Sequence, residues 1–265
     1  MVDVICAELP SAGSRVHADV IIRAGGTAVN AAVAATAAGA ASTVIGRVGS
    51  DPAGDLVSAA LAERDIAGQL ARDPDLSTGA AVALGATVIA HRGANAQLSP
   101  EDIPEPLAAD ALLVSGFALL QHGSAAAATV ALERFAGRWA AVDTASPKLA
   151  VAARTEELTA NANVILATAD EARALTGAEP EGAAYRLASQ FEIACIKLGE
   201  QGAIAVRGDR VERAAAKPVA DRPAFGAGDA FAGALLVALV RDDPLDRALE
   251  VACEAGARLA REAPG

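Results

Sequence analysis

The sequence is poor in the residues that stabilise small extracellular folds. Only three of its 265 residues are cysteine, and only 3% are aromatic. Cys6, Cys195 and Cys253 lie far apart and form no C-x-x-C pair, so they fit buried thiols in a reducing compartment better than a disulfide framework or a zinc site. Because rings are so few and alanine supplies much of the apolar content, helices and close backbone packing are favoured over an aromatic-rich β-sandwich.

The sequence also lacks a long apolar run and an excess of basic residues. No segment has the unbroken apolar length of a membrane span, and the first residues do not have the pattern of a signal peptide. A net charge of −11 argues against a nucleic-acid-binding surface and against attraction to anionic membranes. We therefore expect a cytoplasmic protein with no nucleic-acid or membrane partner. A nucleotide substrate stays open, because backbone N–H groups and a bound Mg²⁺ can reverse the field inside one cleft.

Several familiar catalytic signatures are missing as well. The chain has no G-x-x-x-x-G-K-[ST] phosphate loop and no G-x-S-x-G nucleophile elbow. His17, His91 and His122 are not spaced as metal ligands. Gly226-Ala-Gly228 lacks the third glycine of the dinucleotide fingerprint. These four kinds of site are thereby excluded.

What the sequence does have is a regular alternation of short apolar runs and helical stretches. Hydrophobic residues make up 53% and charged residues 21%, so one α/β domain over residues 1–265 can bury a sizeable core. We predict strands at 111–115, 139–143, 163–167 and 192–198, and helices at 124–137, 147–158, 169–176 and 182–190. Such alternation indicates a mostly parallel sheet with helices on both faces, which binds its ligand at the carboxyl ends of the strands.

The first part of the chain differs from this pattern. Four strand-like runs, at 3–9, 16–23, 79–84 and 87–91, form two pairs with no helix inside a pair. We expect them to form a small antiparallel sheet beside the main one, drawn from about residues 3–24 and 79–92. The segments 27–41 and 52–64 have helical patterns and belong to the main body.

The most informative segment is Gly226-Ala-Gly-Asp229, which opens an apolar helical pattern. Its two glycines expose backbone N–H groups at a helix N-terminus, a setting that attracts phosphate. Asp229 stands in that setting although its carboxylate repels phosphate. One interpretation is a base that takes a proton from a hydroxyl while the loop steadies the phosphoryl group being attacked. The other is an ordinary aspartate in a first helical turn, where that residue is favoured anyway.

Two more glycine-rich segments precede helices. Gly25-Gly26 allow a ligand to approach the backbone closely, and Asn30 one turn later has an amide that can bridge ligand hydroxyls. A plain glycine turn followed by a helical asparagine is the alternative. The segment 46–54 is interpreted as mainly structural, with Asp51 as an N-cap and a proline at the first helical position.

A fourth segment, Leu198-Gly-Glu-Gln-Gly202, is a tight turn between two strand-like runs. It is either a simple hairpin or a backbone cradle for the phosphates or ribose of a nucleotide. Lys197 stands just before it, within reach of a phosphate.

Taken in order, the segments resemble the ribokinase-like carbohydrate kinases, also called the phosphofructokinase-B type. The resemblance covers nearly the whole chain and is found in GGTAVNAA (25–32), IGRVGSDPAG (45–54), RGANAQLSPED (92–102), DE and LTG (170–177), KLGEQGA (197–203) and GAGDAFAGAL (226–235). It implies a three-layer α/β/α sandwich with a mostly parallel central sheet and a small β-sheet lid. It also implies transfer of the γ-phosphate of ATP to a sugar hydroxyl with the help of Mg²⁺.

The resemblance also implies residue roles, carried over by position. Asp229 matches the catalytic base, and Gly226, Ala227 and Gly228 belong with it to the loop that forms the backbone anion hole. The sugar hydroxyls are held at positions matched by Asp3, Gly25, Gly26 and Asn30. The nucleotide-binding turn is matched by Lys197, Gly199 and Gly202, with Cys253 near the adenine pocket, and Glu171 matches the acid that organises Mg²⁺ through water.

Departures from the family pattern concern the cations. The magnesium motif normally pairs an asparagine with the glutamate three residues later, but Thr168 stands where the asparagine would be. Ahead of the glycine loop, the usual Asp-Thr-Thr is replaced by Pro223-Ala-Phe225. Because that aspartate helps many relatives bind a monovalent cation, dependence on K⁺ stays open.

The acceptor and the assembly are open too. The first hypothesis is an ATP-dependent kinase that acts on a small sugar. The second is a nucleoside kinase of the adenosine or pseudouridine type, although the lid strands hold few rings that could stack on a base. The third is a catalytically weak sugar-binding relative, motivated by Thr168 and by the altered approach to the glycine loop. Lid strands often pair between subunits in this family, so we expect a homodimer.

Overall fold

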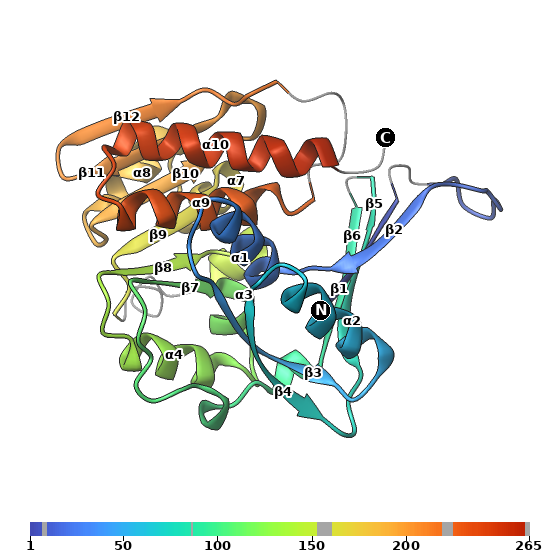
Figure 1. Cartoon of the computed structure of the whole chain (residues 1–265). Coiled ribbons are helices and arrows are strands. Elements are labelled where there is room, and N and C mark those ends of the chain that lie inside the picture. The colour runs from blue at the N-terminus through green and yellow to red at the C-terminus, as the bar shows by residue number, and fades with distance from the viewer. Residues whose placement is uncertain (7–9, 86, 153–160, 219–224, 263–265) are drawn as a thin grey trace.

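The main body is built on a six-stranded sheet in the order β12-β11-β10-β9-β8-β7 (Figure 1). The computed structural model describes residues 1–6, 10–85, 87–152, 161–218 and 225–262. The strands of this sheet are β7 (Ala111–Ser115), β8 (Trp139–Asp143), β9 (Val164–Thr168), β10 (Ile193–Lys197), β11 (Ala203–Arg207) and β12 (Arg210–Ala214). β7 to β10 run parallel, whereas β11 and β12 add an antiparallel hairpin at one edge.

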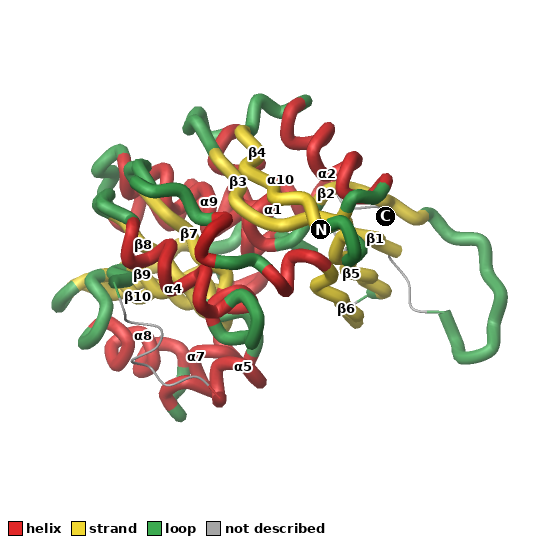
Figure 2. The backbone as a smooth tube through the Cα atoms, turned by 90° about the horizontal axis from the view of Figure 1, so that it is seen from below, coloured by secondary structure: helices red, strands yellow, loops and turns green. Residues whose placement is uncertain are grey.

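Helices cover both faces of this sheet (Figure 2). One face packs against α9 (Ala227–Val240) and α10 (Leu245–Glu262), and the other against α4 (Ala125–Arg134), α7 (Ala169–Thr176) and α8 (Pro180–Ala188). Val164 and Leu166 of β9 pack toward α9 and α10, whereas Ile165 between them packs toward the opposite layer, because successive side chains of a strand point to opposite faces. The predicted three-layer α/β/α sandwich is confirmed.

A second sheet, which we call the lid sheet, has the order β2-β1-β5-β6. Its strands are β1 (Val2–Cys6), β2 (Val20–Ala24), β5 (Thr78–Leu84) and β6 (Thr87–Gly93). β5 and β6 lie close to the predicted runs, whereas β2 begins four residues later than predicted, and residues 7–9 of the first predicted run lie outside the described residues. The prediction of an antiparallel sheet is wrong at its centre, where β1 and β5 run parallel. These strands are joined through the body rather than by a turn, so no hairpin fixes their relative direction.

Between the two pairs of lid strands, the chain enters the body through α1 (Thr27–Ala37), β3 (Thr43–Gly49), α2 (Pro52–Ala62) and β4 (Ala67–Asp73). β3 and β4 form a parallel pair. Asp51 caps α2 as predicted, since its Oδ1 accepts the Gly54 N–H at 2.8 Å. Its Oδ2 accepts the N–H of Thr78 at 2.7 Å, so this loop also anchors the start of β5.

The remaining described elements are short connections: η1 (Ala94–Gln97), η2 (Pro100–Asp102), α3 (Gly116–Leu119), α5 (Pro147–Ala152) and η3 (Gly199–Gln201). α5 begins the helix predicted at 147–158, and the rest of that segment lies outside the described residues, as do Pro223 and Ala224 before the glycine loop. In the described part of the chain, no helix is both long enough and apolar enough to cross a membrane.

Candidate active site

Three parallel strands of the body end in polar residues at the same edge of the sheet. Asp143 ends β8, Thr168 ends β9 and Lys197 ends β10. α9 begins at this edge as well, because a Cβ added to Gly228 would stand only 3.4 Å from Nζ of Lys197. The predicted glycine loop therefore faces the carboxyl ends of the strands, where sheets of this kind bind ligands.

Gly226 shapes the start of α9. Its φ of 87° lies in the left-handed region that favours glycine, and a Cβ there would stand 2.8 Å from Nδ2 of Asn30. Of the three N–H groups expected in an anion hole, that of Asp229 already donates to the Gly226 carbonyl at 3.1 Å. The N–H groups of Ala227 and Gly228 donate to no described residue. They remain available to an anion at the positive end of the α9 dipole.

Asp229 is half-buried in the first turn of α9. Its Oδ2 accepts a hydrogen bond from Nδ2 of Asn30 at 3.0 Å. Burial, helped by the Asp143 and Asp3 carboxylates, raises the pKa of Asp229 to about 6, and the Asn30 hydrogen bond and the Lys197 ammonium oppose the rise. A carboxyl group with this pKa is ionised at neutral pH and still basic enough to take a proton from a hydroxyl.

Lys197 and Asp143 form a buried ion pair next to this loop. Nζ of Lys197 lies 2.9 and 2.7 Å from the two carboxylate oxygens of Asp143. Burial alone would lower the pKa of Lys197, but the Asp143 carboxylate more than offsets it, so the pKa of Lys197 is raised and the ammonium stays charged. Burial raises the pKa of Asp143, with Lys197 opposing. The Lys197 ammonium therefore lies beside the glycine loop, with its charge balanced by Asp143.

Glu171 is held in the first turn of α7 by a reciprocal capping box with Thr168. Its Oε2 accepts the Thr168 N–H at 2.7 Å and the Thr144 hydroxyl at 2.8 Å. Among the described residues, no cluster of three or more His, Cys, Asp or Glu side chains could form a metal cage. A single fixed carboxylate suits Mg²⁺, which keeps several waters and takes its other ligands from substrate phosphates. The residues present therefore fit the water-mediated role expected of Glu171.

Asp3 lies fully buried on β1, and neither of its carboxylate oxygens accepts a hydrogen bond from a described residue. Gly25 packs directly on it, since a Cβ there would stand 1.8 Å from Oδ2 of Asp3. Burial raises the pKa of Asp3, and the opposing effects come first from the Arg23 guanidinium and then from the nearby Gly26 N–H and Asn30 amide. Buried carboxylates normally accept hydrogen bonds, so this group is suited to accept hydrogen bonds from the hydroxyl groups of a ligand.

The expected nucleotide turn is a hairpin between β10 and β11. The Leu198 N–H donates to the Gly202 carbonyl at 2.8 Å, and η3 with Gly199 fills the turn. Lys197 at its start lies at the strand ends described above. Cys253 lies on α10 in the core between helix and sheet, with its Sγ 3.9 Å from the Ala214 carbonyl. Burial raises the pKa of the Cys253 thiol to about 11, so it is a neutral, apolar group at neutral pH.

Asp143 and Thr144 belong to this site as well, although the sequence did not lead us to predict either of them. A signal for Asp143 was present, because a charged residue ends a predicted strand that is otherwise apolar and buried. Its partner could not be read from the sequence, since Lys197 lies on a strand two positions away in the sheet.

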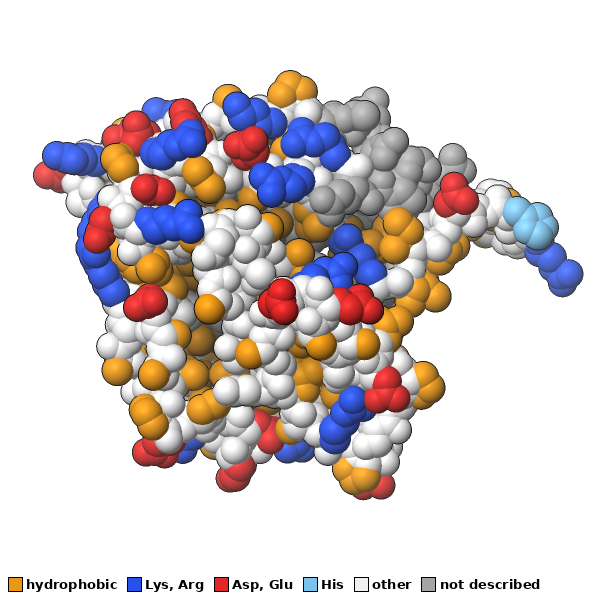
Figure 3. Space-filling model, in the orientation of Figure 1, with side chains coloured by type: hydrophobic (Ala, Val, Ile, Leu, Met, Phe, Trp, Pro, Cys, Tyr) orange, Lys and Arg blue, Asp and Glu red, His pale blue; other side chains and the backbone are white. Residues whose placement is uncertain are grey.

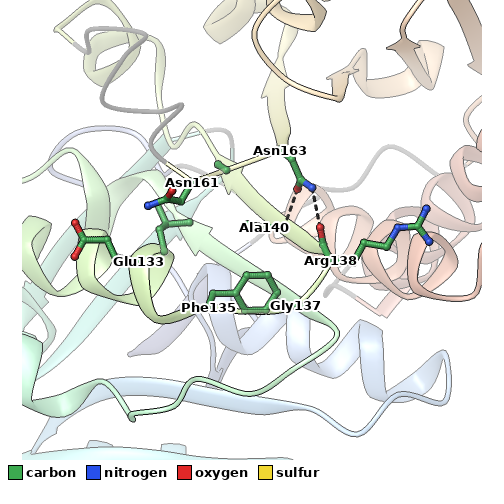
Figure 4. A pocket seen from close by; sticks show the side chains of 9 residues that line it. Glu133, Phe135, Gly137, Arg138, Ala140, Asn161 and Asn163 are labelled. Atoms are coloured by element: carbon green, nitrogen blue, oxygen red, sulfur yellow. Dashed lines mark hydrogen bonds between the residues drawn. The ribbon is translucent and has the colours of Figure 1, made fainter.

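A cavity of about 370 Å³ lies elsewhere, at the amino ends of β8 and β9 (Figure 4). Its lining includes Glu133, Phe135, Arg138 and Asn163. Asn163 accepts the Ala140 N–H at 2.9 Å and donates to the Arg138 carbonyl at 2.7 Å, so its amide bonds to the backbone. This cavity is at the opposite edge of the sheet from Asp229 and belongs to no part of the site.

Comparison with known proteins identifies the family. A profile of the pfkB family carbohydrate kinases matches residues 2–263. The chain belongs to this family. Its fold also matches an adenosine kinase from Sinorhizobium meliloti (20% identity, TM-score 0.84), with 97% of this chain and 90% of that one aligned. Among curated proteins, none matches the chain in sequence.

Two further structures with a similar fold contain ligands. Aminoimidazole riboside kinase from Salmonella enterica, in complex with aminoimidazole riboside and an ATP analogue, is 24% identical with a TM-score of 0.81, covering 98% of this chain and 90% of that one. Fructokinase from Vibrio cholerae O395, with fructose, ADP and calcium bound, is 25% identical with a TM-score of 0.79, covering 97% and 90%. The family is therefore that of the pfkB carbohydrate kinases, and the fold is one that this chain shares with these sugar and nucleoside kinases.

Proposed function

We propose that the protein transfers the γ-phosphate of ATP to a hydroxyl group of a small sugar. The observation that carries the proposal is the setting of Asp229, a carboxylate held by Asn30 beside the Lys197 ammonium and the backbone N–H groups of Ala227 and Gly228, which donate to no described residue. A carboxylate there weakens simple phosphate binding. It becomes useful when an acceptor hydroxyl must lose its proton to attack phosphorus.

Each part of the site then has a chemical task. Asp229 accepts the hydroxyl proton at a carboxylate oxygen. The N–H groups of Ala227 and Gly228 and the dipole of α9 stabilise the negative charge of the transferring group, and the Lys197 ammonium, whose charge Asp143 balances, lies next to them. The acceptor is held by Asp3, Gly25, Gly26 and Asn30, and the nucleotide by Gly199, Gly202 and a surface near Cys253.

Mg²⁺, when bound with ATP, neutralises the β- and γ-phosphate oxygens. Glu171 is the residue of this chain that would hold it, through water, because its Oε2 is fixed by two hydrogen bonds. The residues just before Phe225, where the sequence departs from the family pattern, lie outside the described part of the chain, so the role of K⁺ is measured directly in the assay below.

The proposal is tested by a coupled ADP-release assay with MgATP over a panel of pentoses, hexoses, sugar acids and nucleosides, with and without K⁺. Strong stimulation of ADP release by at least one sugar is expected. Binding of a sugar without any ATP turnover would instead favour the third hypothesis, a sugar-binding relative with little catalysis.

A nucleoside kinase is the second candidate. Two structural neighbours act on nucleosides by name, and Phe117 in α3 is 39% exposed after the carboxyl end of β7, where a ring could stack on a base. The described lid strands carry no Phe, Tyr or Trp, however. A sugar is therefore favoured, and higher kcat/KM for a nucleoside than for any sugar in the same panel would reverse this choice.

For the assembly, we propose a homodimer formed through the lid sheet. Ile22, Val4, Val82 and Ile89 lie opposite one another across its four strands, and Ile22 and Ile89 are more than half exposed. Like surfaces meet at a twofold interface, so an apolar row of this kind suits a second copy of the chain. Light scattering after size exclusion should give a dimer, and Ile22→Glu with Ile89→Glu should give a monomer.

A further inference from the structure

We infer that Arg23 is a second acceptor-binding residue of the lid sheet. Its Nε–H donates a hydrogen bond to an oxygen of the sugar, while Asp3 accepts hydrogen bonds from the sugar hydroxyls. This inference rests on the kinase function proposed above. Arg23 on β2 lies directly opposite Asp3 on β1 in the antiparallel register, so both side chains stand on the same face of the lid sheet.

The two side chains do not satisfy each other. Nε of Arg23 is buried and donates to no described residue, and both carboxylate oxygens of Asp3 are buried without a donor. Adjacent groups of opposite charge usually close into a hydrogen-bonded pair, because an unmade hydrogen bond in a dry interior costs free energy. An unpaired Nε–H of Arg23 beside two unpaired carboxylate oxygens of Asp3 indicates that a polar ligand forms hydrogen bonds with both residues.

Arg23 also reaches the loop that carries Asp229. Its Nη2 lies 3.4 Å from the carbonyl oxygen of Phe225, the residue just before Gly226. The Asp3 carboxylate is near enough to Asp229 to raise its pKa, and Asn30 donates to Asp229 and lies close to Asp3 as well. An acceptor that is bound between Asp3 and Asp229 therefore lies next to Arg23. On the visible face of the molecule, basic side chains gather in the hollow beside β2 (Figure 3).

The pair favours an uncharged, polyhydroxylated part of the acceptor. Asp3 offers two acceptor oxygens, and Arg23 offers an N–H donor whose charge the Asp3 carboxylate balances, so the pair has no net charge with which to select an anion. A sugar hydroxyl fits Asp3, and a ring or hydroxyl oxygen fits Nε of Arg23. Ala81 and Ala90 continue the same row across β5 and β6, so small side chains leave room beside the pair.

The test compares Arg23→Lys, which keeps the charge but has no Nε–H, with Arg23→Met, which removes both. Arg213→Met is the matched control, because Arg213 also lies on an edge strand but pairs with the exposed Glu181 on the body. ADP release is measured with D-ribose, D-fructose, D-gluconate and adenosine, and KM is determined for the acceptor that wild type uses best. Thermal midpoints are measured on the same variants without ligand.

Both Arg23 variants should raise the KM of the acceptor by about 10- to 100-fold, the effect expected for loss of a hydrogen bond from a charged group. The KM of ATP should not change, and the thermal midpoint of Arg23→Lys should stay near that of wild type, because the lysine keeps a positive charge beside Asp3 and the deleted Nε–H had no partner. Arg213→Met should leave both KM values at those of wild type.

An active wild type with unchanged acceptor KM in both Arg23 variants would overturn the role of Arg23 and leave the kinase proposal intact. A wild-type KM in Arg23→Lys alone would contradict the Nε–H contact, since charge would then suffice. A lower thermal midpoint with unchanged KM would instead make Arg23 a structural tether to Phe225. A wild type that phosphorylates none of the acceptors would overturn the proposed function and this inference together.

Discussion

At the scale of single residues, the candidate site gathers carboxylates that are costly to bury. Asp229, Asp143 and Asp3 each have a pKa that burial raises, and only Asp143 has a full ion-pair partner in Lys197. Groups whose environments raise their pKa in this way are over-represented at catalytic sites. Their different pairing fits different tasks: Asp229 as a base, Asp143 as the support of Lys197 and Asp3 as a ligand-binding group.

The raised pKa of Asp229 predicts a pH dependence of catalysis. A base acts only when it is deprotonated, so kcat/KM should rise with pH through about 6, tenfold per pH unit on the acid side, and then level off. A pH–rate profile from pH 4.5 to 8 with the best acceptor measures this. A profile that is flat down to pH 5 would contradict the role of Asp229.

The same shift predicts a pH dependence of stability. The folded-state pKa of about 6 exceeds the ordinary aspartate value of 3.8, so the native state retains a proton that the unfolded chain loses. The stability from this group is complete below about pH 4 and is lost as pH rises through 6. Asp229→Asn should therefore be more thermostable than wild type at pH 7.5, with the advantage fading toward pH 4. A constant difference in Tm across this range would show that Asp229 does not titrate as described.

Asp143 and Lys197 act on the pKa of Asp229 with opposite signs, which gives a test of the ion pair. The Asp143 carboxylate raises that pKa and the Lys197 ammonium lowers it. Asp143→Asn should move the acid limb of the kcat/KM profile to lower pH, and Lys197→Met should move it to higher pH.

Each of these single variants should also lose about 3–5 kcal/mol of stability, because it leaves one charge buried without its partner. The double variant should regain part of that loss, as chemical denaturation can measure. Shifts of the acid limb in the same direction in both single variants would contradict the arrangement.

At the scale of secondary structure elements, the position of Asn30 relative to Asp229 depends on close packing of α1 against α9. Gly233 of α9 makes this possible, because a Cβ there would stand 2.1 Å from the Ala31 carbonyl oxygen of α1. The hydrogen bond from Asn30 to Asp229 joins the same two helices one turn away.

Gly233→Ala should push α1 and α9 apart, lower the free energy of unfolding by about 1–3 kcal/mol and reduce kcat. Gly182→Ala is the matched control. Gly182 is also helical, but a Cβ there would meet nothing closer than the Ala178 Cβ at 3.6 Å, so stability should stay the same or rise slightly. Equal denaturation midpoints for wild type and Gly233→Ala would show that the two helices can separate at no cost.

Element boundaries were largely predictable because local patterns determine them. The strands 111–115 and 139–143 and the helix 169–176 were predicted with the bounds that the structure has. The parallel pairing of β1 and β5 was not predictable, because it joins segments separated by α1, β3, α2 and β4 and no turn specifies it. Local patterns define elements, whereas the packing of distant elements decides their pairing.

The site was predictable to a similar extent. The loop containing Asp229 stands out because glycines and an acid precede an apolar helix, and Gly25 and Asn30 follow a related pattern. The ion pair between Lys197 and Asp143 depends on which strands lie close together in the sheet, and the hydrogen bond from the Asp229 N–H to the Gly226 carbonyl depends on the geometry of the first turn of α9. These contacts become visible only in the folded chain.

At the scale of the whole molecule, the protein is a three-layer body with a lid sheet at the edge where its parallel strands end. Asp3 and Arg23 belong to the lid sheet, whereas Asp229, Lys197 and Glu171 belong to the body. In the reaction proposed above, residues of the lid sheet hold the acceptor and residues of the body hold the phosphate, so the reaction requires both parts. The pfkB family membership fits this division, and the proposed chemistry depends on Asp229 at the junction.

The most direct test is transfer of labelled phosphate from γ-³²P-ATP to the best sugar acceptor by wild type and by Asp229→Asn at pH 7.5. Asp209→Asn, an exposed change in the turn between β11 and β12, serves as the control. We predict labelled sugar phosphate with wild type and the control, and a kcat lower by roughly two to four decades with Asp229→Asn. A folded Asp229→Asn variant that transfers phosphate at the wild-type rate would contradict the account.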